Sequence, residues 1–76
     1  MDAEKLFEIV KRRPFEPMRV HLSDGKHYEV RHPEQLLVSR RWSYVGLNGG
    51  GSGPFQDTAI IDNVHVSRIE PISSGN

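Results

Sequence analysis

The chain has 76 residues, the size of one domain, with 36% apolar residues and a formal net charge of zero from ten basic and ten acidic side chains. This balance removes the overall basic excess typical of nucleic-acid-binding domains, although it leaves room for a local basic patch. The sequence contains no cysteine, which excludes disulfides and cysteine-based metal sites, and no apolar run is long enough to span a membrane. Because residues 1–10 begin acidic and lack the apolar core of a signal peptide, we expect a cytoplasmic location.

The first predicted element is a helix over residues 2–12. Asp2 can cap its N-terminus, and apolar side chains recur at the i, i+3, i+4, i+7 spacing of one helix face. These side chains are Ala3, Leu6, Phe7 and Val10, with Ile9 beside them. We expect this whole face, Phe7 included, to pack on the rest of the domain. Pro14 ends the helix, because the residue before a proline is pushed out of helical geometry.

Residues 19–31, RVHLSDGKHYEVR, predict a β-hairpin around an Asp-Gly pair. A two-residue loop would pair Val20 with Glu29 and place an apolar and a charged side chain on the same face. A three-residue loop instead pairs Val20 with Tyr28, so that partners share an environment, and we therefore predict the longer loop. Gly25 then occupies the left-handed position of the turn, which only glycine adopts without strain.

Pro33 interrupts the chain after the hairpin, because proline cannot donate to a central ladder. Further strands are predicted at residues 35–39, 42–47, 58–62 and 64–72, with a flexible glycine-rich loop at 48–54 and a disordered tail at 73–76. One helix followed by about five short strands predicts a single α+β domain over residues 1–72, with the helix packed on a small five-stranded antiparallel β-barrel. A small barrel without disulfides gains stability by oligomerisation, so a homo-oligomer is a further expectation.

The order of a helix, a strand–turn–strand reading VHLSDGKHYEV and a closing pair reading IIDNVHVSRIEP resembles Sm-like proteins, especially the bacterial Sm-like RNA chaperone. Matches to the first Sm motif are Val20, Leu22 and Gly25. Matches to the second are Ile60, Ile61, Val66, Ile69 and Pro71. The resemblance implies a small barrel that binds RNA.

Three departures affect what the resemblance implies. Val30 stands where Sm proteins usually have a second glycine, and residues 30–38 have neither an acid nor an amide at the places that hold bases. Asp62 and Asn63 replace the basic step of the closing motif, so the RNA contacts of the family do not carry over.

The strand order also resembles a Src-homology-3-like barrel. The pattern PFxPxRxHLSDG…HPE…RIEP is similar to that of short bacterial proteins, and it implies no activity.

One cluster of residue types points to nucleic acid. Trp42 directly follows Arg40 and Arg41, and we expect Arg31 and His32 to lie near them across the sheet. Basic groups beside an aromatic platform can pair with phosphates and stack on bases, as single-stranded RNA or DNA requires. The alternative is that the single Trp lies in the core and that the arginines are solvated in a turn.

Other patterns carry less chemistry. His21 and His27 should face each other across the hairpin, which could hold a metal only with a third ligand; two exposed strand histidines are the alternative. The segment NGGGSGP lacks the Lys-Ser/Thr of a phosphate-binding loop, and no nucleophile, base and acid are brought together by their spacing. We therefore expect no enzyme, no cofactor and no metal, but a binding module.

Two partners remain open for this module. One is single-stranded RNA or DNA, and the other is a protein that uses exposed strand edges. The distribution of basic residues on the fold separates them. One contiguous basic face with Trp42 exposed would favour nucleic acid, whereas alternation of basic with acidic residues would favour a protein partner.

Overall fold

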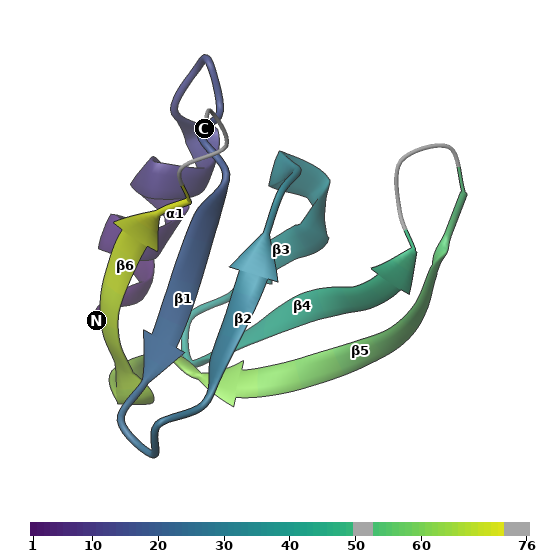
Figure 1. The fold of residues 1–76 in the computed structure, drawn as a ribbon. Coiled ribbons are helices and arrows are strands. Elements are labelled where there is room, and N and C mark those ends of the chain that lie inside the picture. The colour runs from purple at the N-terminus through teal and green to yellow at the C-terminus, as the bar shows by residue number, and fades with distance from the viewer. Residues whose placement is uncertain (50–52, 73–76) are drawn as a thin grey trace.

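The computed structural model describes residues 1–49 and 53–72, and these form one α-helix, six β-strands and two short 3-10 helices (Figure 1). In chain order the elements are α1 (Ala3–Lys11), β1 (Met18–Leu22), β2 (His27–Val30), η1 (Pro33–Gln35), β3 (Leu36–Val38), β4 (Trp42–Gly49), β5 (Phe55–Asp62), η2 (Asn63–His65) and β6 (Val66–Pro71). The predicted α+β class is confirmed. In the described part of the chain, no helix is long and apolar enough to cross a membrane.

The strands form two antiparallel sheets of three strands each, in the orders β2-β1-β6 and β3-β4-β5. In Figure 1, β6, β1 and β2 stand side by side, while β4 and β5 cross below them and extend to the right. The expected five strands are therefore six, and the described residues do not close into one barrel. The reason lies at Pro33, where η1 separates β2 from β3 and directs them into different sheets.

The hairpin has the predicted register, with Val20 opposite Tyr28. The loop contains three residues, because the backbone N–H of Leu22 donates to the carbonyl of Lys26 at 2.8 Å. Gly25 has a φ of 94°, in the left-handed region that favours glycine. This register turns Val20 into the core and leaves the alternate residues of β1 and β2 on the outer face.

The helix is also where it was predicted, but the buried part of its apolar face differs. Asp2 caps it by accepting a hydrogen bond from the backbone N–H of Lys5 at 2.8 Å. Leu6 is fully buried, whereas Phe7 is 51% exposed, so the prediction that Phe7 packs into the core is wrong. The side chain lies at the margin of the buried stripe, with the ammonium of Lys11 5.3 Å from its ring centroid.

The hydrophobic core lies between the two sheets and α1. Its buried members are Leu6, Met18, Val20, Val30, Leu36, Val45, Ile61 and Val66. Phe15, from the connector after α1, packs against this cluster while staying partly exposed. The core is small. The helix and each of the six strands contribute at least one buried residue, and the outer segments of β4 and β5 contribute none.

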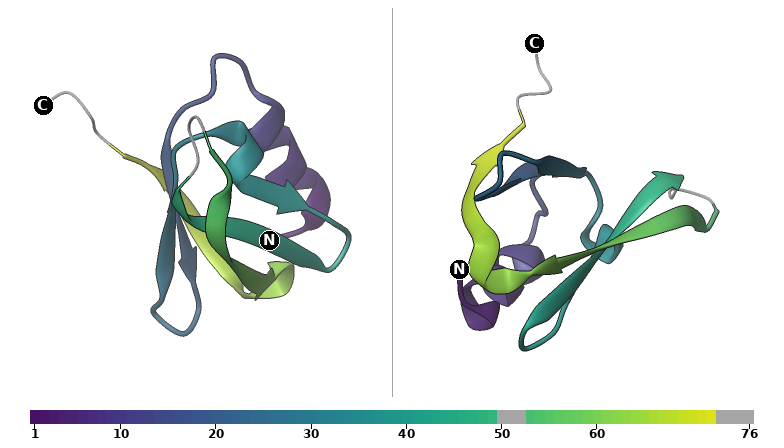
Figure 2. Two further views of the ribbon diagram at one scale, coloured as in Figure 1. Left: turned by 90° about the vertical axis from the view of Figure 1, so that its right-hand side faces the viewer. Right: turned by 90° about the horizontal axis from the view of Figure 1, so that it is seen from below.

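The β4–β5 pair reaches beyond the body of the domain (Figure 2). It is longer than predicted, because β4 continues to Gly49 and β5 begins at Phe55. The strands thus take up part of the predicted loop, and residues 50–52 lie outside the described part, as does the predicted tail at 73–76. A Cβ atom on Gly46 would meet the Phe55 ring at 2.5 Å, so the aromatic ring fills the space that glycine leaves.

Candidate binding surface

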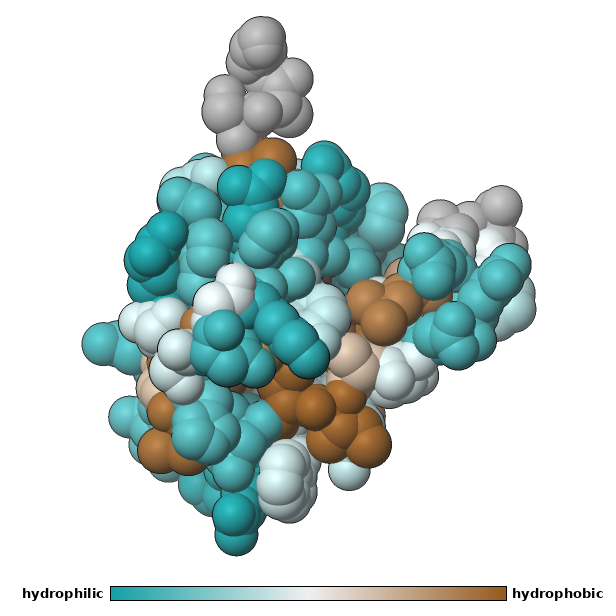
Figure 3. Space-filling model, turned by 60° about the horizontal axis from the view of Figure 1, so that its bottom comes forward, coloured by the Kyte–Doolittle hydropathy of each residue, from teal (hydrophilic) through white to brown (hydrophobic). Residues whose placement is uncertain are grey.

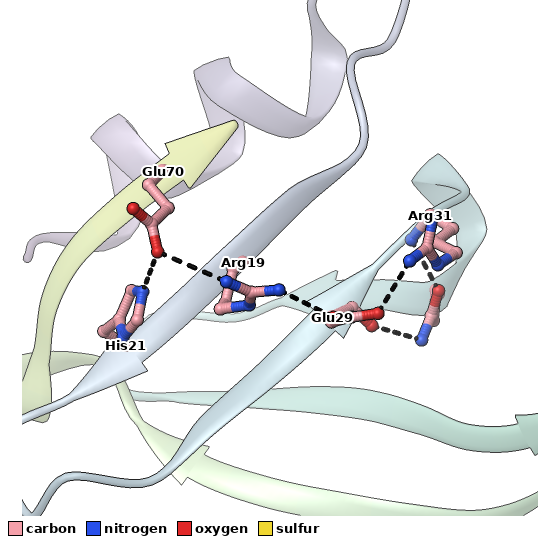
Figure 4. A network of polar contacts seen from close by, with 6 residues as sticks. Arg19, His21, Glu29, Arg31 and Glu70 are labelled. Atoms are coloured by element: carbon pink, nitrogen blue, oxygen red, sulfur yellow. Dashed lines mark hydrogen bonds and ion pairs between the residues drawn. The ribbon is translucent and has the colours of Figure 1, made fainter. Parts of the chain in front are cut away.

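The two sheets expose outer faces of opposite character, and the face of β2-β1-β6 is charged. Arg19 lies between Glu29 on β2 and Glu70 on β6 (Figure 4). Its guanidinium nitrogens lie 2.9 Å from Glu29 Oε2 and 3.6 Å from Glu70 Oε1. His21 Nε2 is hydrogen-bonded to Glu70 Oε1 at 2.6 Å, and Arg31 holds the second Glu29 oxygen at 2.8 Å. Arg19, His21, Glu29, Arg31 and Glu70 are thus linked to one another, whereas Arg68, opposite His21 on β6, is exposed to solvent.

These contacts shift the carboxyl groups of the face toward their charged form. The hydrogen bond from Arg19, followed by that from Arg31, lowers the pKa of Glu29 below its ordinary value. The hydrogen bond to His21 is the main cause that lowers the pKa of Glu70. Both glutamates are therefore ionised near neutral pH, and the arginines beside them are already neutralised. Arg19 and Arg31 therefore offer little free positive charge to a phosphate backbone.

The outer face of β3-β4-β5 is apolar. Leu37 pairs with Tyr44, and Tyr44 pairs with Ile60, so one large side chain from each strand lies in a single cross-strand row. Their exposed fractions are 65% for Leu37, 36% for Tyr44 and 61% for Ile60. Trp42 is 42% exposed and lies on the same side of β4, two residues before Tyr44. We call these four residues the apolar face. A contiguous group of exposed apolar side chains marks an interaction site.

Asn63 holds the turn that leads into the apolar face. Its side chain is buried; Nδ2 donates to the carbonyls of Ser39 at 2.7 Å and Arg40 at 3.3 Å. Its Oδ1 accepts from the hydroxyl of Ser43 at 2.6 Å, and its backbone N–H donates to the carbonyl of Arg41 at 2.8 Å. One side chain thus fixes the whole connection between β3 and β4.

The structure brings three of the predicted site residues together at this turn. The guanidinium of Arg41 lies 4.9 Å from the ring centroid of Trp42, and its Nε lies 3.4 Å from Asp62 Oδ2. Arg40 Nη1 lies 3.6 Å from Glu4 Oε2. Because Trp42 is exposed, the alternative that places it in the core is wrong. Both arginines, however, have a carboxylate beside them.

Arg31 and His32 do not join this group. The backbone N–H of Arg31 donates to Gln35 Oε1 at 2.8 Å, and Gln35 Nε2 donates to the carbonyl of Gly46 at 2.9 Å. Gly46 is four residues from Trp42, which is about 13 Å along a strand. The five residues of the predicted site therefore fall into two groups, separated along β4.

The predicted histidine pair forms, but no metal site surrounds it. The rings of His21 and His27 lie with their centroids 5.6 Å apart. His21 is already hydrogen-bonded to Glu70. Within residues 1–49 and 53–72, no group of three or more His, Cys, Asp or Glu side chains could hold a metal ion.

Reasoning from the sequence did not identify Leu37, Tyr44 and Ile60 as surface residues. A signal for Tyr44 was available in the alternation along β4. Ser43 and Val45 alternate with two aromatic residues, and both are fully buried in the structure. On such a strand the side chains of one face fill the core. Aromatic side chains on the opposite face then remain exposed and available to a partner.

Comparisons of the chain with known proteins found no similarity that bears on this surface. No family model, no curated protein and no solved structure matches the chain.

Proposed function

We propose that this domain is a non-catalytic interaction module that binds another protein through the apolar face. The observation that carries the proposal is the exposed row of Leu37, Tyr44 and Ile60, which crosses all three strands of one sheet. The charge distribution supports a protein partner over nucleic acid. Arg19 and the three arginines of the predicted site, Arg31, Arg40 and Arg41, each lie beside a carboxylate.

The strand arrangement supports a small barrel of the Sm-like or Src-homology-3-like type as the scaffold. Five residues, 31–35, which include η1, separate β2 from β3, so the two can be regarded as one strand bent at Pro33, which reduces six strands to five. The first and last strands, β1 and β6, pair with each other, as closure of such a barrel requires. In this proposal the scaffold serves to display the apolar face.

A photo-crosslinking amino acid in place of Leu37 tests the proposed function in the cell that makes the protein. We expect protein adducts that disappear when Ile60→Lys is added, because lysine places a charge in the same cross-strand row. The matched control carries the crosslinker at Arg68, which is exposed on β6 of the other sheet. If no adduct at position 37 depends on Ile60, the apolar face is not a binding surface. An adduct of twice the mass of the chain identifies a second copy as the partner.

Single-stranded RNA or DNA is a second candidate, favoured by one specific observation. Trp42 and Tyr44 lie on the same face of one strand, about 7 Å apart, and Arg41 stacks over the Trp42 ring. Exposed aromatic rings beside a cation can stack successive bases. When the crosslinking is repeated in an extract of the same cells, this candidate predicts adducts that nuclease removes and that weaken between about 50 and 200 mM salt.

A further inference from the structure

The outer edge of β5 has free backbone groups. This strand is the last in the order β3-β4-β5, so within residues 1–49 and 53–72 only its inner edge pairs with a neighbouring strand. The backbone N–H of Asn63 donates to the carbonyl of Arg41, its opposite residue beside the β4–β5 ladder. Backbone groups alternate in direction along an antiparallel strand. Counting back from Asn63 in steps of two, Ile61, Ala59 and Asp57 therefore bond to β4. The residues between them direct their backbone N–H and C=O groups away from β4. The outward residues are Thr58 and Ile60, together with the N–H of Asp62, because Asp62 is the N-cap of η2 and its carbonyl belongs to the first turn of that helix.

The facing edge of β2 is less open. The bond between Leu22 and Lys26 fixes the alternation of the hairpin, so that His27 and Glu29 direct their backbone groups away from β1. The carbonyl of Glu29, however, already accepts a hydrogen bond from Gln35 Nε2 at 2.8 Å. Outward backbone groups thus extend over Thr58, Ile60 and the N–H of Asp62 on β5, whereas on β2 they are limited to His27 and the N–H of Glu29.

A cleft of about 450 Å³ separates the outer edge of β5 from the β1–β2 hairpin. Its volume is within the range of about 300–1,000 Å³ usual for binding sites. The hairpin wall includes Leu22, Asp24, Lys26 and Tyr28, and the other wall includes Ile60, Ile61 and Asp62. Figure 3, which brings the bottom of the molecule forward, shows apolar surface at the centre of this side between hydrophilic flanks.

We infer that this cleft binds an extended peptide segment of a partner protein, which adds to the β3-β4-β5 sheet as a fourth strand beside β5. The inference rests on the proposed function and names the class of partner. An added strand would satisfy the outward groups of Ile60 and its neighbours, which is how sheet edges recruit peptides. The hairpin stands opposite this part of the edge, so a single extended segment fits the cleft, whereas a second copy would have to bring a whole sheet.

The two faces of the sheet define the chemistry of the segment. Side chains on one side of the added strand would enter the cleft, where apolar Leu22, Tyr28 and Ile61 stand beside charged Asp24, Lys26 and Asp62, so they are apolar or small and polar. Side chains on the other side would extend the row of the apolar face beyond Ile60, so they are apolar or β-branched. The expected ligand is an extended stretch rich in valine, isoleucine and threonine, without proline.

The test uses a soluble, end-capped peptide of six alternating threonine and valine residues between two lysines, added to the full ¹⁵N-labelled chain at up to about 1 mM. We expect the amide exchange of Thr58, Ile60 and Asp62 to slow on addition of the peptide, with saturable shifts of Tyr28 in the opposite wall. A control peptide of the same length with a central proline should not produce these changes.

Two variants separate pairing by the backbone from contact with a side chain. Ile60→Pro removes an outward N–H without taking a bond from the β4–β5 ladder, whereas Ile60→Thr keeps the N–H and shortens the side chain. Pairing predicts that Ile60→Pro weakens binding roughly tenfold and Ile60→Thr by less than about threefold. If Ile60→Pro does not fold, Thr58→Pro, which removes another outward N–H, takes its place.

Two outcomes would overturn the inference. Shifts confined to Leu37 and Tyr44, with equal losses in both Ile60 variants, would show binding on the apolar face and leave the proposed function intact. No binding of the peptide would exclude strand addition, and the crosslinks from position 37 would still decide on the proposed function by themselves.

Discussion

At the scale of single residues, Asn63 carries the most demanding role in the domain. A buried side-chain amide supplies donors and an acceptor together, and all of them are used in the turn between β3 and β4. We predict that Asn63→Asp destabilises the domain by about 2–4 kcal/mol, because it removes the donors to the carbonyls of Ser39 and Arg40. Urea unfolding followed by circular dichroism measures the change.

The control for Asn63→Asp is the neighbouring Val64, which is well exposed on η2. Val64→Ala should change the free energy of unfolding by less than about 0.5 kcal/mol. Equal effects of the two substitutions would mean that the Asn63 network does not hold the turn. The sequence alone did not reveal this role, because a polar residue near a turn is ordinary, and its burial depends on the return of η2 against a turn some 20 residues earlier.

At the scale of elements, α1 shows that neighbouring apolar residues of one helix stripe can differ in burial. Leu6 is fully buried and Phe7 is half exposed. We predict that Leu6→Ala costs about 2–5 kcal/mol, the range for a buried leucine, while Phe7→Ala costs less than about 1 kcal/mol. Thermal or urea unfolding of both variants provides the measurement. A larger loss for Phe7→Ala than for Leu6→Ala would reverse the assignment of the buried face.

The hairpin and the helix differ in how far the sequence could predict them. The register of β1 and β2 follows from local rules, since Gly25 limits the turn and only one loop length matches Val20 with an apolar partner. The helix could be located for similar reasons, through Asp2 and Pro14. Which side of α1 points inward depends on where the two sheets lie, and periodicity alone could not separate Phe7 from Leu6.

The predicted site shows the same division. Arg40, Arg41 and Trp42 are neighbours in sequence, so their proximity was certain, and the exposure of Trp42 was the open question. The expectation that Arg31 would join them placed it near Trp42 across one sheet, and the interruption predicted at Pro33 did not say in which direction the chain continues. The 3-10 helix η1 redirects the chain at that point, and Gln35 then fixes Arg31 near Gly46 instead.

At the scale of the whole molecule, the charged face of the β2-β1-β6 sheet makes stability depend on pH. The pKa values of Glu29 and Glu70 are both lowered in the folded protein from an ordinary value of 4.5, by hydrogen bonds to Arg19 and to His21 respectively. Between the lowered values and 4.5, the unfolded chain binds more protons than the folded protein. The contribution of these two glutamates is therefore fully present above 4.5 and is lost as the pH falls through the lowered values.

A variant with both Glu29→Gln and Glu70→Gln tests this dependence. We expect it to be less stable than the natural chain at pH 7, and the difference to shrink steadily from pH 4.5 downward, since the natural carboxylates are then neutralised as well. Urea unfolding of both proteins at pH 7, 4.5 and 3 gives the comparison, and Glu34→Gln removes the same kind of charge from an exposed position on η1. A difference that stays constant over this range would show that the ion pairs around Arg19 do not stabilise the fold.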